Sequence, residues 1–217
     1  MPLKVLTTKS TSKYITIFDF DEIDNNAVLA IGGGAIIDQA KILAYESGRP
    51  CYAIPTTASG AACTSWAVVW HKNHRESVPT GKPILLEIYR CMKIKLPSDV
   101  LEATLYDCKA HIQDSLCSIK ANEESRAYCQ IATQYLKRHA CFNHIADLID
   151  AGNFAGRAIE ITGTNYLHAI SYVLTLDYEI PHGQALKIAM TMPKQYNWNK
   201  IIKKAQKYPK FHERTHS

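Results

Sequence analysis

The chain has 217 residues, of which 47% are hydrophobic, and its formal net charge at pH 7 is +5. This composition provides enough apolar surface for a globular protein of one domain or two small ones, and it argues against a low-complexity chain. No segment has the length and apolar character needed to span a bilayer, and the N-terminal segment MPLKVLTTKSTSKYITIF lacks the uninterrupted apolar core of a signal peptide. The sequence therefore predicts a soluble, cytoplasmic protein without a membrane partner.

The cysteines and the excess of positive charge each have a simple interpretation. Seven cysteines are scattered along the chain without a C-x-x-C pair, which favours reduced thiols. Positive charge is concentrated late in the chain, between Lys194 and Arg214. A nucleic-acid-binding patch could have this composition, but no RNA- or DNA-binding signature accompanies it, so a solvated helix and tail is the preferred interpretation. No nucleic-acid partner is expected.

The first clear unit is a strand, a glycine turn, a helix and a second strand. After a short strand-like stretch up to Ile23, residues 27–31 (AVLAI) form the continuous apolar run that is typical of a strand buried on both faces of a parallel sheet. Glycines at 32–34 end this run, and apolar residues at helical spacing follow until Gly48 ends the helix. Residues 51–54 predict a second buried strand, which completes a βαβ unit.

The glycine turn is a candidate binding site for a phosphate group. Backbone N–H groups at a helix N-terminus carry partial positive charge, and Gly32, Gly33 and Gly34 would let a ligand approach closely. A dinucleotide is the natural candidate, although the usual G-x-G-x-x-G pattern is absent and three glycines can also form a mere tight turn. Thr56 and Thr57 follow the second strand, at the edge where open α/β sheets bind ligands, but they could also be simple turn residues.

The residues around this unit have plainer interpretations. Asp38 and Lys41 fall on the helix after the glycine turn, where an exposed charge is the simplest expectation, above all for Lys41. Beyond the threonine pair, SGAACTSWAVVW predicts a turn and another strand, whereas the polar segment HKNHRESVPTGKP predicts a loop.

From about residue 97 almost every segment has helical spacing. Ser98 or Asp99 can cap the first helix. We expect helices at residues 99–106, 107–120, 123–139, 141–151 and 154–176, the last with a break near Gly163. A domain boundary is therefore placed close to residue 97.

This helical part contains four potential metal ligands in two pairs. Asp107 and His111 are four residues apart, so they lie one turn apart on the same face of a helix. His168 lies on a later helix, and Pro181 places His182 at a turn or at the start of the next helix. A single Asp or His here would more often be a capping or buried, hydrogen-bonded side chain, but two spaced pairs favour a metal site. Carboxylate and imidazole ligands suit Fe²⁺ or Zn²⁺.

On the helix that carries Asp107 and His111, the potential ligands and the apolar residues lie on different faces. Asp114 continues the polar stripe of Asp107 and His111. A second stripe on the same helix is expected to face the core and consists of Ile112, Leu116 and Ile119. A second cluster of potential metal ligands consists of His139, Cys141 and His144. Their spacings of two and three residues do not place them on one helix face, so this rival cluster is interpreted as part of a surface helix.

These motifs, in this order, resemble those of the iron-containing alcohol dehydrogenase family, which belongs to one superfamily with glycerol dehydrogenase and dehydroquinate synthase. The family's G-G-G-S-x-x-D-x-A-K turn resembles GGGAIIDQAK at residues 32–41, and its P-T-T-A segment resembles residues 55–58. Its D-x-x-x-H motif, followed by an acid three residues later, resembles residues 107–114. Its H-A and P-H-G patterns resemble residues 168–169 and 181–183.

The resemblance covers roughly residues 27–190 and implies how the site is built. NAD or NADP would bind to the N-terminal part, with the glycine turn at the pyrophosphate, Asp38 near the nicotinamide end, and Thr56 and Thr57 lining the cleft. The helical part would bind one divalent metal ion, Fe²⁺ or Zn²⁺, through Asp107, His111, His168 and His182.

The implied activity is metal-dependent hydride transfer between NAD(P) and a small alcohol, aldehyde or ketone. Two other classes remain open. A cyclase or lyase of the dehydroquinate synthase type would act on a phosphorylated sugar acid, and it predicts a cluster of Lys and Arg facing the metal. A non-catalytic homologue would act as a binding or structural subunit.

The chain also departs from the family pattern. Ala35 replaces the usual Ser of the glycine turn, and SGAACTS replaces the usual stretch after the threonine pair. Tyr172 lies where many members have a second His, so a catalytic proton relay there would use a phenol or water.

Only 26 residues precede Ala27 and 35 follow His182, fewer than in the family. We therefore expect an α/β domain with an incomplete, Rossmann-like parallel sheet at residues 1–97, followed by an all-α metal-binding domain at residues 98–217. The open sheet edge favours a homo-oligomer.

Overall fold

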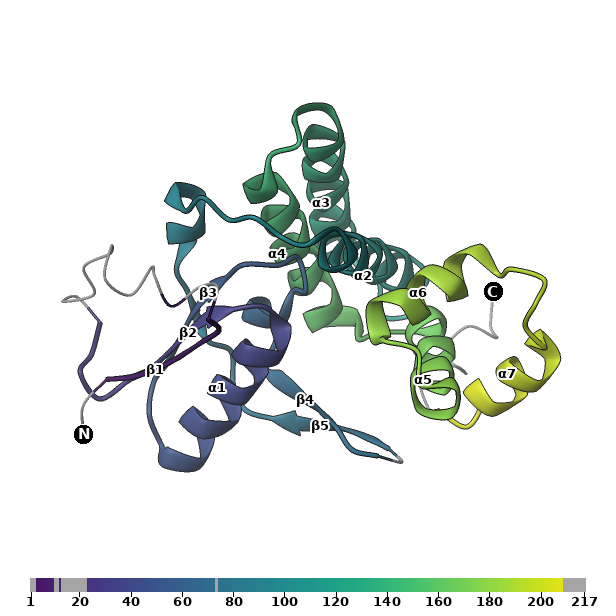
Figure 1. Ribbon diagram of the computed structural model, residues 1–217, viewed down its shortest axis with the longest axis horizontal. Coiled ribbons are helices and arrows are strands. Elements are labelled where there is room, and N and C mark those ends of the chain that lie inside the picture. The colour runs from purple at the N-terminus through teal and green to yellow at the C-terminus, as the bar shows by residue number, and fades with distance from the viewer. Residues whose placement is uncertain (1–2, 10–11, 13–22, 73, 209–217) are drawn as a thin grey trace.

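The computed structural model describes residues 3–9, 12, 23–72 and 74–208, which form a parallel sheet with helices followed by a helical part (Figure 1). The sheet has the strand order β1-β2-β3-β6, and every neighbouring pair is parallel. Its strands are β1 (Lys4–Thr7), β2 (Val28–Gly32), β3 (Cys51–Pro55) and β6 (Ile84–Leu85). Strand β1 is part of the strand-like stretch expected before Ile23, of which residues 1–2, 10–11 and 13–22 lie outside the described residues.

Strand β2 is the centre of the α/β part, and all five of its residues are buried. Because successive side chains of a strand point to opposite faces, Leu29 and Ile31 pack on one side with Ile149, whereas Val28 and Ala30 pack on the other side against helix α1 (Gly34–Ser47). The prediction of a strand buried on both faces is confirmed.

Helix α1 begins and ends at glycines, as the sequence predicted. Gly33 precedes it in an extended conformation, and Gly48 ends it with a φ of 64°. This left-handed conformation favours glycine because a side chain there would be strained. The backbone N–H of Arg49 donates to Ala44 O at 2.9 Å, which satisfies a carbonyl of the last turn.

The segment predicted to be a loop, residues 71–83, contains a strand of a hairpin, so that prediction is wrong for residues 75–79. Strands β4 (Trp66–Trp70) and β5 (Arg75–Pro79) pair antiparallel, with Trp70 opposite Arg75. Strand β5 carries Arg75, Glu76 and Ser77 and is mostly exposed, so it lacks the apolar pattern by which a buried strand is recognised. Between the threonine pair and β4 lies a short 3-10 turn, Ala61–Cys63.

The helical part differs in its boundaries from the expected set. The two helices expected at residues 99–106 and 107–120 are one helix, which ends at Leu116. The next helical segment is continuous through residue 152, between the helices expected at 141–151 and 154–176, and the break lies at Gly163, which has a φ of 69°. A further 3-10 turn, Glu87–Cys91, precedes this part. The helices are α2 (Ser98–Leu116), α3 (Glu123–Phe142), α4 (Ile145–Thr162), α5 (Tyr166–Tyr178), α6 (His182–Thr191) and α7 (Trp198–Ala205).

The expected core stripe on α2 is only partly correct. Ile112 is buried, but Leu116 is 42% exposed and Ile119 is 66% exposed. Helix α2 ends at Leu116, so Ile119 no longer continues its face. In the rival cluster, Cys141 and His144 are exposed, as predicted, whereas His139 is half-buried.

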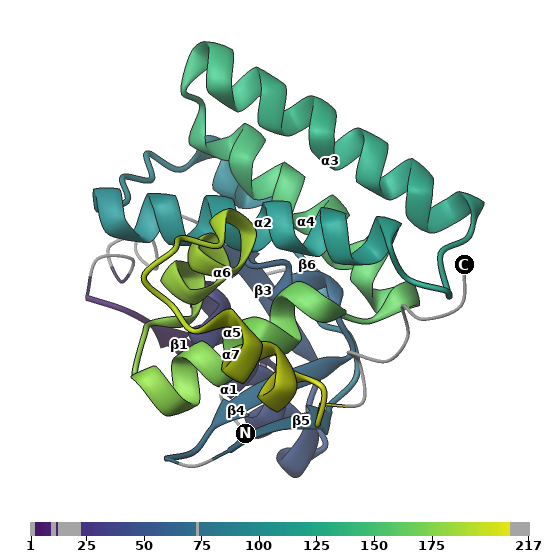
Figure 2. The same cartoon turned by 90° about the vertical axis from the view of Figure 1, so that its right-hand side faces the viewer.

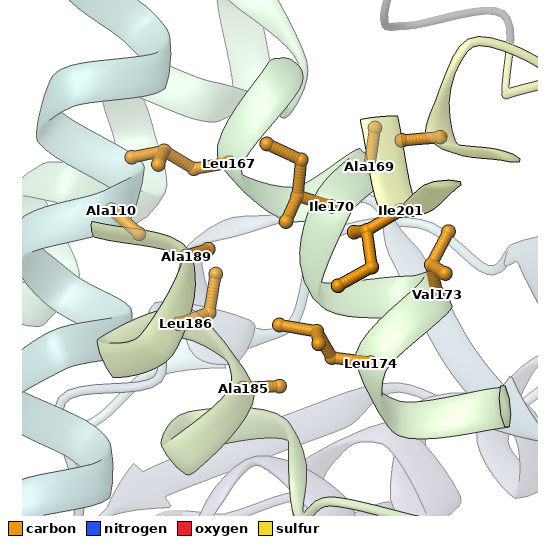
Figure 3. Close-up of a cluster of buried hydrophobic side chains, with 11 residues drawn as sticks. Ala110, Leu167, Ala169, Ile170, Val173, Leu174, Ala185, Leu186, Ala189 and Ile201 are labelled. Atoms are coloured by element: carbon orange, nitrogen blue, oxygen red, sulfur yellow. The ribbon is translucent and has the colours of Figure 1, made fainter. Parts of the chain in front are cut away.

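The helices form two groups (Figures 1 and 2). Helices α2, α3 and α4 run side by side, whereas α5, α6 and α7 lie at the end of the molecule that is farthest from β1. Side chains from α2, α5, α6 and α7 interlock in one apolar cluster, which includes Ala110, Leu167, Leu174, Leu186 and Ile201 (Figure 3). Among the described residues, no helix combines the length and apolarity that crossing a bilayer would require.

Helix α4 contacts the α/β part through two glycines. A Cβ atom on Gly152 would lie 2.4 Å from Cα of Ala58, and one on Gly156 would lie 2.5 Å from the carbonyl oxygen of Gly60. Any larger residue would overlap with backbone at these points, so α4 lies directly against residues 58–60. The domain boundary near residue 97 stays a prediction.

Candidate metal and cofactor site

Three of the four expected metal ligands meet at one point. Asp107 lies on α2, His168 on α5, and His182 is the first residue of α6, directly after Pro181. Asp107 Oδ1 is 3.5 Å from His168 Nε2 and 4.0 Å from His182 Nε2. One donor atom from each residue lies within 4.8 Å of the other two. Three helices that are distant in sequence thus contribute one side chain each to a compact group.

The group fits a divalent metal ion. Two ligands bound tetrahedrally at about 2.1 Å from an ion lie about 3.4 Å apart, close to the observed spacing. Asp107 Oδ1 and His168 Nε2 are buried, and neither has a hydrogen-bond partner within the described part of the chain. Buried polar atoms are normally satisfied, so these two atoms are placed for a ligand. One carboxylate with imidazoles suits Fe²⁺ or Zn²⁺.

His111 lies at the edge of this group. Its Nε2 is 3.4 Å from Asp107 Oδ1, and its ring stacks on the His168 ring with centroids 4.7 Å apart and an interplanar angle of 4°. The four-residue spacing therefore places Asp107 and His111 together, as predicted. His111 is not part of the set whose atoms are all mutually close.

His168 is oriented from behind by a second carboxylate. Its Nδ1 lies 2.8 Å from Asp114 Oδ2, and Asp114 is fully buried. Such a carboxylate fixes the ring orientation and leaves the other nitrogen facing the ligand group. Asp114 matched the family motif, but no separate role for it was predicted.

The electrostatics of the group favour the ligand forms of its side chains. Burial alone would raise the pKa of Asp107, but the imidazoles of His111, His168 and His182 lower it to about 2. Burial lowers the pKa of His182 to about 3, against the attraction of Asp107. Burial also disfavours the charged form of His168, yet the carboxylates of Asp107 and Asp114 raise its pKa overall. At neutral pH the group thus offers an ionised carboxylate and, in His182, a neutral imidazole.

A cavity of about 1060 Å³ connects this group with the glycine turn. Its lining includes Gly33, Gly34, Thr56, Thr57 and Asp107. Gly33, Gly34, Thr56 and Thr57 were predicted to line a cofactor cleft, and in the structure all four line this one cavity. A volume of this size accommodates a dinucleotide-sized ligand.

The glycines are required by space rather than by φ. A Cβ atom on Gly33 would lie 3.2 Å from Thr57, and one on Gly34 would lie 3.0 Å from Ser59, so side chains here would fill the cavity wall. Gly32 lies behind the turn, where a Cβ atom would lie 2.9 Å from the Ile36 side chain. These contacts fit a cradle for a phosphate group at the start of α1.

Asp38 and Lys41 form a buried pair, so the expectation of an exposed Lys41 is wrong. Lys41 is 1% exposed, and its Nζ is 3.0 Å from Asp38 Oδ1. It also donates to Ala61 O at 2.9 Å and to Thr64 Oγ1 at 3.2 Å, because residues 61–66 fold over α1. Burial lowers the pKa of Lys41, and Asp38 opposes this shift.

Asp38 also faces a second cavity of about 320 Å³, which contains the metal-ligand group. Its Oδ2 accepts a hydrogen bond from the backbone N–H of Val68 at 3.1 Å. Burial raises the pKa of Asp38, while Lys41 lowers it. The carboxylate is thus anchored at the wall of the cavity.

Tyr172 lies beside the ligand group in the same cavity. Its ring centroid is 6.1 Å from that of His182, and its hydroxyl is 3.3 Å from Thr164 Oγ1. Burial raises the pKa of Tyr172, so its hydroxyl retains the proton at neutral pH.

Sequence reasoning missed the residues that the hairpin contributes. Trp70 lies with its ring 5.4 Å from that of His182, and Arg75 Cζ lies 4.4 Å from the Tyr172 ring centroid. No local signal marks either residue, because only the hairpin geometry brings them to the cavity. Among the described lining residues of this cavity, Arg75 is the one Lys or Arg, so the basic cluster expected of a dehydroquinate synthase-like site is not seen there.

Comparisons with known proteins agree with this geometry. A family model described as iron-containing alcohol dehydrogenase matches residues 8–86, and one described as the C-terminal part of the Fe-containing alcohol dehydrogenase family matches residues 106–214. A 1-propanol dehydrogenase of Citrobacter freundii is 25% identical over 210 residues, which cover 88% of this chain and 56% of that protein.

Two other relatives add to this picture. A phosphonoacetaldehyde reductase of Streptomyces viridochromogenes is 26% identical over 212 residues, covering 79% of this chain and 53% of that protein. A glycerol-1-phosphate dehydrogenase of Methanococcus maripaludis is 33% identical over 124 residues, covering 50% and 36%. The chain thus spans about half the length of the curated relatives it matches.

Solved structures show the same fold. An iron-containing alcohol dehydrogenase aligns with a TM-score of 0.67 and 22% identity, covering 90% of this chain and 64% of that chain. Another, from Thermotoga maritima, aligns with a TM-score of 0.67 and 20% identity, covering 90% and 62%. With both family models matched in order and the ligand motifs in place, the chain belongs to the iron-containing alcohol dehydrogenase family.

Proposed function

We propose that this protein is a metal-dependent oxidoreductase that interconverts a small alcohol and its aldehyde or ketone with NAD or NADP. The observation that carries the proposal is the position of Asp107, which lines both the glycine-turn cavity and the cavity of the metal-ligand group. A nucleotide and a substrate in these cavities would therefore meet at this carboxylate. The names of relatives such as 1-propanol dehydrogenase and 4-hydroxybutyrate dehydrogenase support the reaction class.

The reaction balances without a covalent enzyme intermediate. Oxidation of the alcohol would release one hydride equivalent to the bound nucleotide and one proton to solvent. When bound, NAD(P) would supply the hydride chemistry and a divalent metal would supply a Lewis acid for the substrate oxygen.

The chain's own residues would bind and orient these groups. Asp107, His168 and His182 would hold the ion, with His111 as the fourth ligand, and the glycine turn with Thr56 and Thr57 would hold the nucleotide. Asp38 would support the nicotinamide end through its anchored carboxylate. Tyr172 would hold a proton at its hydroxyl oxygen, 3.3 Å from Thr164 Oγ1, where a relay to solvent can begin.

The test combines elemental analysis with NAD(P)H absorbance. The purified chain, loaded anaerobically with Fe²⁺ or with Zn²⁺, should bind one ion and oxidise NADH or NADPH in the presence of a panel of short aldehydes. His182→Ala should lose the ion and the turnover while it retains its circular dichroism spectrum. His74→Ala, an exposed histidine of the hairpin, is the matched control. Full activity of His182→Ala, or a wild type that binds no metal, would refute the assignment.

The expected homo-oligomer stays a prediction. Strands β1 and β6 are the outer strands of the described sheet, and outer strands offer unpaired backbone groups to a second copy. Light scattering during gel filtration tests this directly, because a monomeric mass at all concentrations would contradict it.

A further inference from the structure

The hairpin places one cation in the cavity that contains the metal-ligand group. Arg75 begins β5 opposite Trp70, and it lines the cavity of about 320 Å³ together with Asp107, His168 and His182. Its Cζ lies 4.4 Å from the centroid of the Tyr172 ring. The ring thus supports the flat face of the guanidinium and leaves its edge for hydrogen bonding.

The hydrogen-bonding capacity of this guanidinium is incompletely used. Its Nη2 donates to Ser77 Oγ at 2.7 Å. Its Nε is buried and has no hydrogen-bond partner within the described part of the chain. A buried donor of a charged group is costly when it is left unsatisfied, so the arrangement is suited to an acceptor that arrives from outside.

The two carboxylates of the cavity are already committed to other groups. Asp38 forms its ion pair with Lys41 at 3.0 Å and accepts from Val68 N, and Asp107 faces the imidazoles of the ligand group. Among the described lining residues, these are the acidic ones. Both carboxylates of the cavity, Asp38 and Asp107, therefore already have partners within the chain. The guanidinium of Arg75 does not pair with either of them, and its natural partner is an anion that enters the cavity.

We propose that Arg75 binds the anionic end of the substrate, so that the preferred substrates are short aldehydes or alcohols with a terminal carboxylate or a similar acid group. This inference rests on the proposed function. The small cavity places the guanidinium and the metal-ligand group on the walls of one space, so a short chain can reach both. Arg75 thereby determines specificity, because a fork of N–H donors matches a carboxylate.

The first experiment compares two aldehydes of equal length, 4-oxobutanoate and butanal, on the metal-loaded chain with NADH or NADPH. Wild type should favour 4-oxobutanoate. Arg75→Met should lower kcat/KM for 4-oxobutanoate by about 10- to 100-fold, mainly through KM, because one charged hydrogen-bonding site is lost. The loss of kcat/KM with butanal should be clearly smaller, so that the ratio of the two kcat/KM values falls, since butanal offers no anionic group to Arg75. Lys72→Met, which removes an exposed cation from the same hairpin, is the matched control and should change neither rate.

Arg75→Lys separates charge from geometry. It should recover part of the 4-oxobutanoate activity, because an ammonium group retains the charge but lacks the planar fork. An equal loss for both aldehydes in Arg75→Met and Arg75→Lys would overturn the inference and assign Arg75 a structural role.

A binding experiment keeps the two hypotheses distinguishable. Succinate is titrated calorimetrically into wild type, Arg75→Met and Lys72→Met without NAD(P)H. Loss of binding in Arg75→Met alone supports the anion site even if no aldehyde is reduced, in which case only the proposed function fails. Equal succinate binding by all three proteins, or no binding by wild type, overturns the role of Arg75 while leaving the reduction of butanal as an independent test of the proposed function.

Discussion

The carboxylate of Asp114 joins the N-terminus of α5 to the ring of His168. Its Oδ2 accepts from His168 Nδ1 at 2.8 Å and from the backbone N–H of Asn165 at 2.7 Å, and its Oδ1 accepts from Leu167 N at 3.1 Å. An acid on α2 thus caps a helix more than 50 residues away and fixes the tautomer of a ligand on that helix. A single position of the Asp114 side chain therefore serves both to cap α5 and to orient the His168 ring.

Asp114→Asn should weaken metal binding by about 10- to 100-fold, because an amide replaces the carboxylate behind His168. The dissociation constant is measured by competition with a fluorescent chelator. Asp99→Asn removes an exposed acid from the first turn of the same helix and should leave metal affinity unchanged. Unchanged affinity in Asp114→Asn would mean that the His168 ring is held by packing alone.

The glycine turn gives a prediction about nucleotide binding. Gly34→Val should weaken NAD(P)H binding at least about tenfold, because even a Cβ atom at this position lies 3.0 Å from Ser59 and a branched side chain would occupy the cavity. The measurement is a titration followed by NAD(P)H fluorescence. A Gly34→Val variant that binds the nucleotide as tightly as wild type would place the pyrophosphate elsewhere.

Ala35→Ser, in the same turn, should strengthen NAD(P)H binding rather than weaken it. Ala35 is exposed and lines both cavities, and a hydroxyl there would add a hydrogen-bond donor toward a bound phosphate. One added hydrogen bond of about 1 kcal/mol corresponds to a roughly fivefold gain in NAD(P)H affinity. The same fluorescence titration checks it, and a loss of affinity would contradict it.

The Lys41 pair predicts a large effect on stability. Lys41→Met should lower the free energy of unfolding by about 3 kcal/mol, because it leaves the Asp38 carboxylate and several loop acceptors without their buried partner. Urea denaturation measures this effect, and Lys4→Met, at an exposed lysine of β1, is the control. In the double variant with Asp38→Asn the loss should be smaller than the sum of the two single losses. Simple additivity would show that the two side chains act independently.

The buried thiols predict a pattern of chemical modification. All seven cysteines are free, and burial raises the pKa of Cys51 to about 11 against the weaker effect of Lys41. At pH 8 its reactive thiolate is therefore scarce. Iodoacetamide should modify the exposed thiols of Cys91 and Cys141 first, as peptide mass spectrometry can follow.

The same shift has a consequence for stability. In the unfolded chain Cys51 ionises near its ordinary value of 9.0, whereas the folded protein holds this proton up to about pH 11. The folded state is therefore favoured by this group below pH 9.0, and the contribution is lost as the pH rises through 11. If iodoacetamide modified Cys51 early in the folded protein at pH 8, that result would contradict the raised pKa of this thiol.

The parts of the fold that the sequence predicted are those encoded locally. The run at residues 27–31, the glycines and Gly48 define a strand, a turn and a helix end within a few residues, and each is found where expected. The spacing of Asp107 and His111 on one helix face likewise brings them together.

What could not be predicted depends on contacts between distant segments. Lys41 is buried because residues 61–66 supply carbonyls that no local pattern announces. Arg75 reaches the cavity because a largely exposed strand pairs with β4, and exposed strands lack the apolar alternation that identifies them. The helix end near Gly163 was predicted from the glycine, whereas no residue near 106 and 107 marks whether one helix or two run through residues 98–116.

The glycines of α4 have a mechanical consequence. Where Gly152 and Gly156 meet residues 58–60, main chain touches main chain, and main-chain atoms cannot rotate aside as side chains do. At this seam the segment that follows the threonine pair is therefore packed tightly against α4, with no side chain between the two backbones to absorb a displacement. We therefore expect an opening that admits a nucleotide to come from segments that rim the cleft, such as residues 93–97, rather than from a displacement at this seam.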